Sequence, residues 1–91
     1  MTGSSTRRRA GRPTSNALEA VREALPDLRK SDAKVARLVL DQPSWILAAT
    51  VATVAERAGV SQPTVIRFCT AVGFVGFQEF KLRLAQAQRG L

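Results

Sequence analysis

One stretch of this sequence, residues 61–70, gathers side chains of the types that proteins use to contact nucleic acids. It contains an arginine, a glutamine and three hydroxyl residues but no acid. Arginine can bond bidentately to guanine and glutamine to adenine, each good pair discriminating by about 1–3 kcal/mol. We therefore expect Gln62 and Arg67 to contact base edges. Hydroxyl groups near a helix start suit phosphate oxygens, and three residues are expected to serve there: Thr53, Ser61 and Thr64.

The spacing around this stretch predicts a helix-turn-helix. Thr50 caps a short helix over residues 51–58, and Gly59 permits the positive φ with which helices commonly end. Ser61 caps the following helix, and Pro63 falls in its first turn, where a missing amide hydrogen costs nothing. A glycine turn between two short helices is the requirement of the motif. An ordinary helical hairpin is the alternative interpretation.

The second helix of this pair has a predictable outward side. Val65, Phe68 and Val72 follow one another at spacings of three and four residues, so they share the inward side. The outward or lateral positions are then Gln62, Pro63, Thr64, Ile66, Arg67 and Thr70. Residues near the start of a recognition helix reach bases in the major groove. We include Pro63 and Thr70 among the DNA-contacting residues; for Arg67 alone, the alternative is a solvated surface arginine.

The rest of the sequence predicts helices and no strands. Apolar residues at helical spacing indicate a helix over 16–25, capped by Ser15 or Asn16, and a second from Ser31, its N-cap, to about Gln42. Residues 44–47 are too few to predict a helix of their own and too apolar to be exposed to solvent. This pattern favours a turn that plugs the core. Phe77 and Phe80 begin a final helix that continues through Leu84. The expected fold is all-α, a compact domain of four to five helices.

The positive charge of the chain is unevenly distributed. The 91 residues carry 14 basic and 7 acidic side chains, a net charge of +7. Residues 1–16 hold four arginines and no acid, which is +4, so the remainder carries 7 − 4 = +3. Because residues 1–15 have almost no large apolar side chain, we expect a disordered, Arg-rich tail before a DNA-binding domain over 16–89. Such a tail can neutralise DNA phosphates, or be a solvated start without a role.

Other classes of function find little support in the composition. With no histidine and a single cysteine, Cys69, the chain can form neither an internal disulfide nor a cysteine–histidine metal cluster. We find no side chain placed to act as a catalytic acid, a catalytic base or an activated nucleophile. We therefore expect no enzyme activity, no cofactor and no metal. No apolar run approaches the ~20 residues that span a bilayer, so no membrane partner is expected. Cys69 is either a redox switch on the recognition helix or, as free cysteine more often is, a small buried hydrophobe.

Residues 50–86 resemble the amino-terminal DNA-binding domain of RpiR-type bacterial transcription regulators. The specific part of the resemblance is a GF-x-GF-x-EFK element over residues 73–81, because a generic helix-turn-helix does not require it. The residues that match the pattern are Val60, Ser61, Thr64, Val65, Arg67, Phe68, Gly73, Phe74, Gly76, Phe77, Glu79, Phe80 and Lys81. Upstream, the similarity extends to Ser31, Lys34, Val35, Ala36 and Pro43, so that it covers residues 20–88.

The resemblance implies a cytoplasmic, nucleoid-associated regulator that binds double-stranded DNA as a homodimer and controls carbohydrate metabolism genes. It also implies a phosphosugar effector, sensed by a sugar isomerase-type domain that is absent from these 91 residues. Within the GF-x-GF-x-EFK element, we assign Lys81 to a backbone phosphate, although basic residues on an amphipathic helix are often only solvated. The alternative function is a helical protein-interaction or dimerisation module without specific DNA binding.

Overall fold

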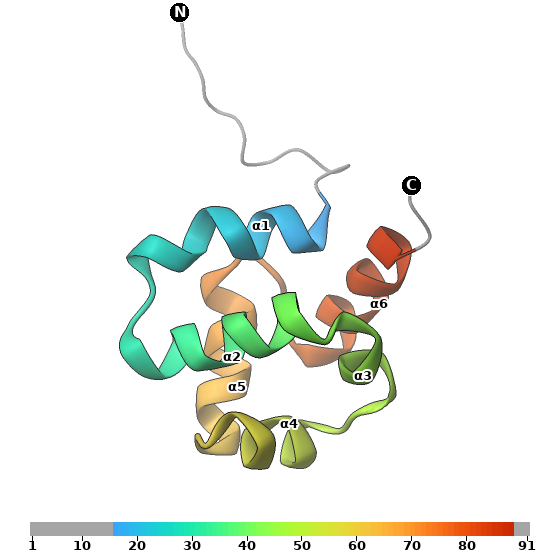
Figure 1. The fold of residues 1–91 in the computed structure, drawn as a ribbon. Helices are drawn as coiled ribbons and strands as arrows, with labels where there is room; N and C mark the ends of the chain where they lie inside the picture. The colour runs from blue at the N-terminus through green and yellow to red at the C-terminus, as the bar shows by residue number, and fades with distance from the viewer. Residues whose placement is uncertain (1–15, 89–91) are drawn as a thin grey trace, which may run out of the picture.

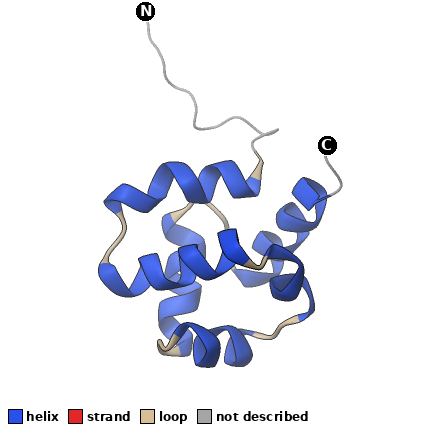
Figure 2. Cartoon of the chain, viewed as in Figure 1, coloured by secondary structure: helices blue, strands red, loops and turns tan. Residues whose placement is uncertain are grey.

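The computed structural model describes residues 16–88, which form six α-helices and one short 3-10 helix (Figure 1). Their bounds are α1 Ala17–Ala24, η2 Leu25–Asp27, α2 Lys30–Asp41, α3 Pro43–Ala48, α4 Val51–Ala58, α5 Gln62–Ala71 and α6 Phe77–Gln88. Figure 2 shows only helices and loops in this part of the chain. The predicted all-α fold is confirmed, with six helices in place of four or five. The predicted Arg-rich tail, residues 1–15, lies outside the described residues.

The two helices at the start of the domain begin in different ways. Asn16, one of the two caps that the sequence allowed, caps α1, since its Oδ1 accepts a hydrogen bond from the Leu18 amide at 2.8 Å. The prediction that Ser31 caps α2 is wrong: this helix begins at Lys30, after Arg29, with no side-chain cap. Ser31 instead lies in the first turn of α2, where its hydroxyl accepts a hydrogen bond from Arg67 of α5 at 3.1 Å.

The apolar segment after Asp41 is a helix rather than the predicted turn. Pro43 occupies the first turn of α3, where its fixed φ suits a helix start, and Ile46 is fully buried. Trp45 and Leu47 pack partly buried against the same core. The predicted function of the segment, to plug the core, is therefore confirmed, but packing against α2 and α6 stabilises a helix too short to be recognised from its own sequence.

The inward side of α5 packs into the hydrophobic core. Val65 and Phe68 are buried as predicted, and the Phe68 ring meets that of Phe80 in α6 edge-to-face at 5.6 Å. The ring of Phe74, which follows α5, also meets that of Phe80 edge-to-face, at 5.3 Å between ring centres. These aromatic contacts join the two helices that follow the turn, as the run of phenylalanines predicted.

The packing of the helices leaves one side of α5 open. In Figure 1, α1 and α4 lie at opposite ends of the domain, with α2 between them. α5 packs against α4, α2 and α6, while α1 packs against α2 and α6. Within residues 16–88, no helix is long and apolar enough to cross a membrane.

Candidate nucleic-acid interface

A capping box closes the start of α4, and a glycine turn at its end fixes the angle between α4 and α5. The hydroxyl of Thr50 accepts from the Thr53 amide at 3.2 Å, and Thr53 Oγ1 accepts in return from the Thr50 amide at 2.9 Å, which closes a capping box at the start of α4. At its other end, Gly59 has φ 75° and the Val60 amide donates to the Ala55 carbonyl at 2.9 Å. The sharp end that the sequence predicted at Gly59 is therefore confirmed. Thr53 remains exposed.

α5 begins with two hydroxyl residues that bond to each other. Ser61 Oγ accepts from the Thr64 amide at 3.3 Å, which confirms the predicted cap, and lies 2.9 Å from Thr64 Oγ1. The prediction that Thr64 lies at an outward or lateral position is wrong, because this residue is 8% exposed and buried. Thr64 and Val65 lie one turn before the buried Phe68, so both positions share the inward side of the helix. Ser61 remains exposed.

The exposed residues of α5 form one continuous stripe, which we call the α5 face. Its members are separated by one, three or four residues, as one side of a helix requires: Gln62, Pro63, Ile66, Arg67, Thr70 and Ala71. Thr70 Oγ1 donates to the Arg67 carbonyl at 2.9 Å, so this hydroxyl is partly used within the helix. No residue of α5 is acidic. The structure thus brings Gln62 to the start of an acid-free surface, with Pro63 beside it.

Arg67 is joined to α2 by a buried acid that the sequence analysis missed. Its Nη2 and Nε donate to Asp32 Oδ1 at 3.0 and 3.2 Å, and Nη2 also donates to Ser31. Asp32 is 3% exposed, whereas the Arg67 side chain is 44% exposed. Helical spacing could have indicated the burial of Asp32, which precedes the buried Val35 and Val39, but not the arginine that it meets. Arg67 is therefore not simply a solvated arginine, while its base contact stays a prediction.

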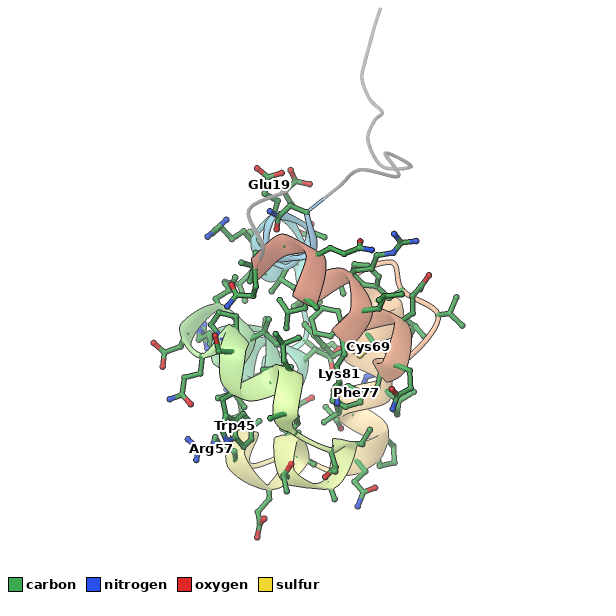
Figure 3. All side chains as sticks on the ribbon, turned by 90° about the vertical axis from the view of Figure 1, so that its right-hand side faces the viewer. Glu19, Trp45, Arg57, Cys69, Phe77 and Lys81 are labelled. Carbon is green, nitrogen blue, oxygen red and sulfur yellow. The ribbon has the colours of Figure 1, made fainter. Side chains whose placement is uncertain are left out.

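Lys81 makes its contacts within the domain. Its Nζ donates to the Ala49 carbonyl at 2.8 Å and lies 5.2 Å from the centre of the Phe77 ring (Figure 3). These contacts satisfy the carbonyl that ends α3 and hold α6 against the link to α4. The predicted phosphate contact of Lys81 has no support from this geometry.

A second cation, Arg57 of α4, joins this helix to α3. The Arg57 guanidinium carbon lies 4.3 Å from the centre of the Trp45 ring in α3, and Figure 3 shows the two side chains together. Arg57 Nη1 also donates to Gln42 at 3.2 Å. A guanidinium over an indole face contributes about 0.5–1 kcal/mol at an exposed site. α4 is therefore tied to α3 on one side while it packs against α5 on the other.

Cys69 is fully buried on the inward side of α5. Desolvation by burial raises the pKa of the Cys69 thiol from 9.0 to about 12. Because only the thiolate is a nucleophile, a group with this pKa is unreactive near neutral pH. This geometry favours the buried-hydrophobe interpretation over the redox switch.

We therefore expect the thiol of Cys69 to resist alkylation in the folded domain. At about pH 8, three pKa units lower the thiolate fraction about 1000-fold, and burial slows the reaction further. A colorimetric thiol reagent should titrate one thiol rapidly in denaturing urea and very slowly without it. Since the pKa is higher in the folded state, the domain should also lose stability as the pH rises above 9.0. Equal reaction rates with and without urea would contradict the burial.

Two short helices around a left-handed glycine, with the second helix exposed along one acid-free side, define a helix-turn-helix domain. Comparison with known families agrees with the fold. Residues 15–89 match the model of the helix-turn-helix domain of the rpiR family. The chain therefore belongs to the rpiR family of helix-turn-helix domains, and the resemblance drawn from its sequence is confirmed.

The relatives of this chain include transcription regulators. It is 40% identical over 72 residues to the HTH-type transcriptional regulator HexR of Pseudomonas aeruginosa and 43% identical over 72 residues to HexR of Escherichia coli, covering 79% of this chain and 25% of each relative. It is also 40% identical over 82 residues to the bifunctional protein glk of Paraburkholderia xenovorans, covering 90% of this chain and 13% of that protein. The chain thus spans about a quarter of the length of the HexR relatives.

A solved structure shares the fold. The N-terminal domain of ybbH from Bacillus subtilis, described as a transcriptional regulator, superimposes with a TM-score of 0.75 at 31% sequence identity. The superposition covers 78% of this chain and 87% of that one. The two chains therefore share the helix arrangement described above.

Proposed function

We propose that this chain is the sequence-specific DNA-binding module of a transcription regulator and not an enzyme, with α5 placed in the major groove. The observation that carries the proposal is the α5 face, an exposed stripe without an acid that starts directly after the Ser61 cap. Membership of the rpiR family and similarity to HexR support the same function. DNA repels carboxylates, so an acid-free helix side suits a groove lined by phosphates.

The proposal gives the candidate residues different tasks. Gln62 is in the first turn of α5 and exposed, the position from which recognition helices contact bases. Ser61 is an exposed hydroxyl residue at the start of α5, suited to a phosphate oxygen. The Thr53 hydroxyl donates to the Thr50 carbonyl at 3.0 Å, so we assign Thr53 to the cap of α4. We assign Arg67 to positioning α5, because Asp32 and Ser31 occupy its Nε and Nη2. Lys81 is left out, since its amine is bound to Ala49.

We expect DNA binding by the chain to weaken steeply with salt. If about four phosphates are neutralised, affinity should fall roughly a hundredfold between about 50 and 200 mM salt, because counterions are released on binding. Fluorescence anisotropy with duplexes selected from a random pool measures this fall. At constant salt, Gln62→Ala should weaken binding to the selected duplex about tenfold, the loss of one good base contact.

The matched control is Gln78→Ala, which removes an exposed glutamine from the first turn of α6, away from the α5 face. This variant should bind the selected duplex as the original chain does. An affinity that does not change with salt, or equal losses from the two glutamine variants, would contradict the proposal.

We further propose that the chain is part of a cytoplasmic, nucleoid-associated homodimer, as the resemblance to RpiR-type regulators implies. This regulator would have a phosphosugar-sensing domain and would control carbohydrate metabolism genes. The similarity to the two HexR proteins covers a quarter of the length of each, which supports a larger regulator of this kind. A dimerisation or protein-interaction module is the second candidate, favoured by the exposed Val75, at 84%, and Leu82, at 57%. Anisotropy with the selected duplex and a scrambled duplex separates the two candidates, because the second predicts equal binding to both sequences and little salt dependence.

A further inference from the structure

Ile66 is a large apolar side chain in the middle of the α5 face. It is 39% exposed, and the other exposed large hydrophobic residues of the described chain, Val75 and Leu82, lie outside α5. Gln62 is one turn before Ile66 and Thr70 one turn after it. The exposed part of Ile66 does not contribute to the core, because Val65 and Phe68 supply the inward contacts of the helix.

The groups around Ile66 restrict what it can contact. Arg67, its neighbour in the chain, is turned toward α2 by Asp32 and Ser31. The rest of the α5 face carries neutral side chains, with Gln62 and Pro63 one turn toward the helix start. An apolar side chain beside a glutamine that bonds to a base can pack on an apolar group in the major groove. The C5 methyl group of thymine is the apolar group that base pairs present there, and it distinguishes thymine from the other bases.

We infer that Ile66 is a specificity-determining residue that packs on the C5 methyl group of a thymine. This inference rests on the proposed function, because it needs α5 in the major groove. One helical turn advances about 5.4 Å and one base step about 3.4 Å, so the thymine lies within about two base pairs of the base that Gln62 contacts. Burying one methyl group is worth about 0.8 kcal/mol, which corresponds to about fourfold in affinity.

The test replaces thymine by deoxyuridine, which lacks only the C5 methyl group. Duplexes are first selected from a random pool with the 91-residue chain, and each thymine of the selected site is then replaced in turn. We expect one replacement to weaken binding about fourfold for the original chain and to have no effect on Ile66→Ala. Alanine is the best helix former, so this variant keeps α5 intact, and circular dichroism verifies its helix content. Val75→Ala, which removes a more exposed apolar side chain outside α5, should retain the fourfold effect.

The possible failures are distinguishable. Selection that enriches no sequence contradicts the proposed function and, with it, the inference. If sequences are enriched but no deoxyuridine replacement weakens binding, or if the same replacement weakens the original chain and Ile66→Ala equally, the inference alone is wrong. A change in the sedimentation of Ile66→Ala with unaltered thymine preference would assign this side chain to contact between two copies of the chain, and would also overturn the inference.

Discussion

Replacing Arg67 by alanine is expected to lower the free energy of unfolding by about 3 kcal/mol, because it leaves the carboxylate of Asp32 without its cation. Asp32 is 3% exposed, so while the domain stays folded it regains only part of its hydration when the guanidinium is removed. Removal of one partner from a buried pair costs about 3–5 kcal/mol. The lower end applies here, since the Arg67 side chain is 44% exposed and water already screens part of the attraction. Urea denaturation followed by circular dichroism measures the loss.

A double-mutant cycle separates the pair from the rest of the packing. The double variant Asp32→Leu with Arg67→Met replaces both charged groups by apolar ones, and it should recover most of the stability lost by Arg67→Met alone because no buried charge is left unpaired. The single variant Asp32→Leu completes the cycle. The control is Arg22→Ala, which removes an exposed arginine from α1 and should change stability by less than about 0.5 kcal/mol. A loss from Arg67→Ala no larger than that from Arg22→Ala would show that the ion pair contributes little.

Asp32→Asn distinguishes a positioning role of Arg67 from direct base contact. The amide keeps the shape of the carboxyl group but no longer holds the guanidinium by charge. If Arg67 positions α5, affinity for the selected duplex should fall together with stability, although residue 32 is buried within the domain. If Arg67 contacts a base, release from Asp32 should leave the affinity unchanged or increase it. Anisotropy at a temperature where both proteins are folded gives the answer.

Replacing Phe80 by alanine is expected to have the largest effect on stability, a loss of about 4 kcal/mol. Phe80 is 1% exposed, and its ring contacts those of Phe68 in α5 and Phe74 after it. The substitution therefore removes apolar burial, leaves a cavity and breaks two edge-to-face contacts. A domain of this size has about 5–15 kcal/mol in total, so the midpoint of thermal unfolding should fall sharply.

Two substitutions in α6 serve as controls for Phe80→Ala. Phe80→Leu keeps most of the apolar volume and should cost about 1.5 kcal/mol. Leu82→Ala removes an apolar side chain that is 57% exposed in the same helix, and it should change stability by less than about 0.5 kcal/mol. Equal thermal midpoints for Phe80→Ala and Leu82→Ala would mean that the aromatic contacts do not hold α6 to α5.

The helix-turn-helix was predictable because the contacts that define it are local. The Thr50 and Ser61 caps each join residues three positions apart, and the left-handed Gly59 needs only the absence of a Cβ. Helical spacing placed Val65 and Phe68 inward for the same reason. The GF-x-GF-x-EFK pattern indicated the family before the fold was known, and the family comparison confirms it.

Contacts between helices far apart in the sequence were not predictable in this way. Spacing along α5 gave no reason to turn Arg67 toward an acid 35 positions earlier, or Lys81 toward a carbonyl 32 positions earlier. Thr64 was misplaced because a hydroxyl residue next to the core stripe is compatible with either side until the neighbouring helices are packed. The sequence by itself determined the helix pair around Gly59, the Thr50 and Ser61 caps, the turn and the family, since these depend on neighbours within a few residues. Only the tertiary structure decided which polar groups of α5 hold the domain together and which remain exposed, because that division depends on the charges and carbonyls that other helices bring to it.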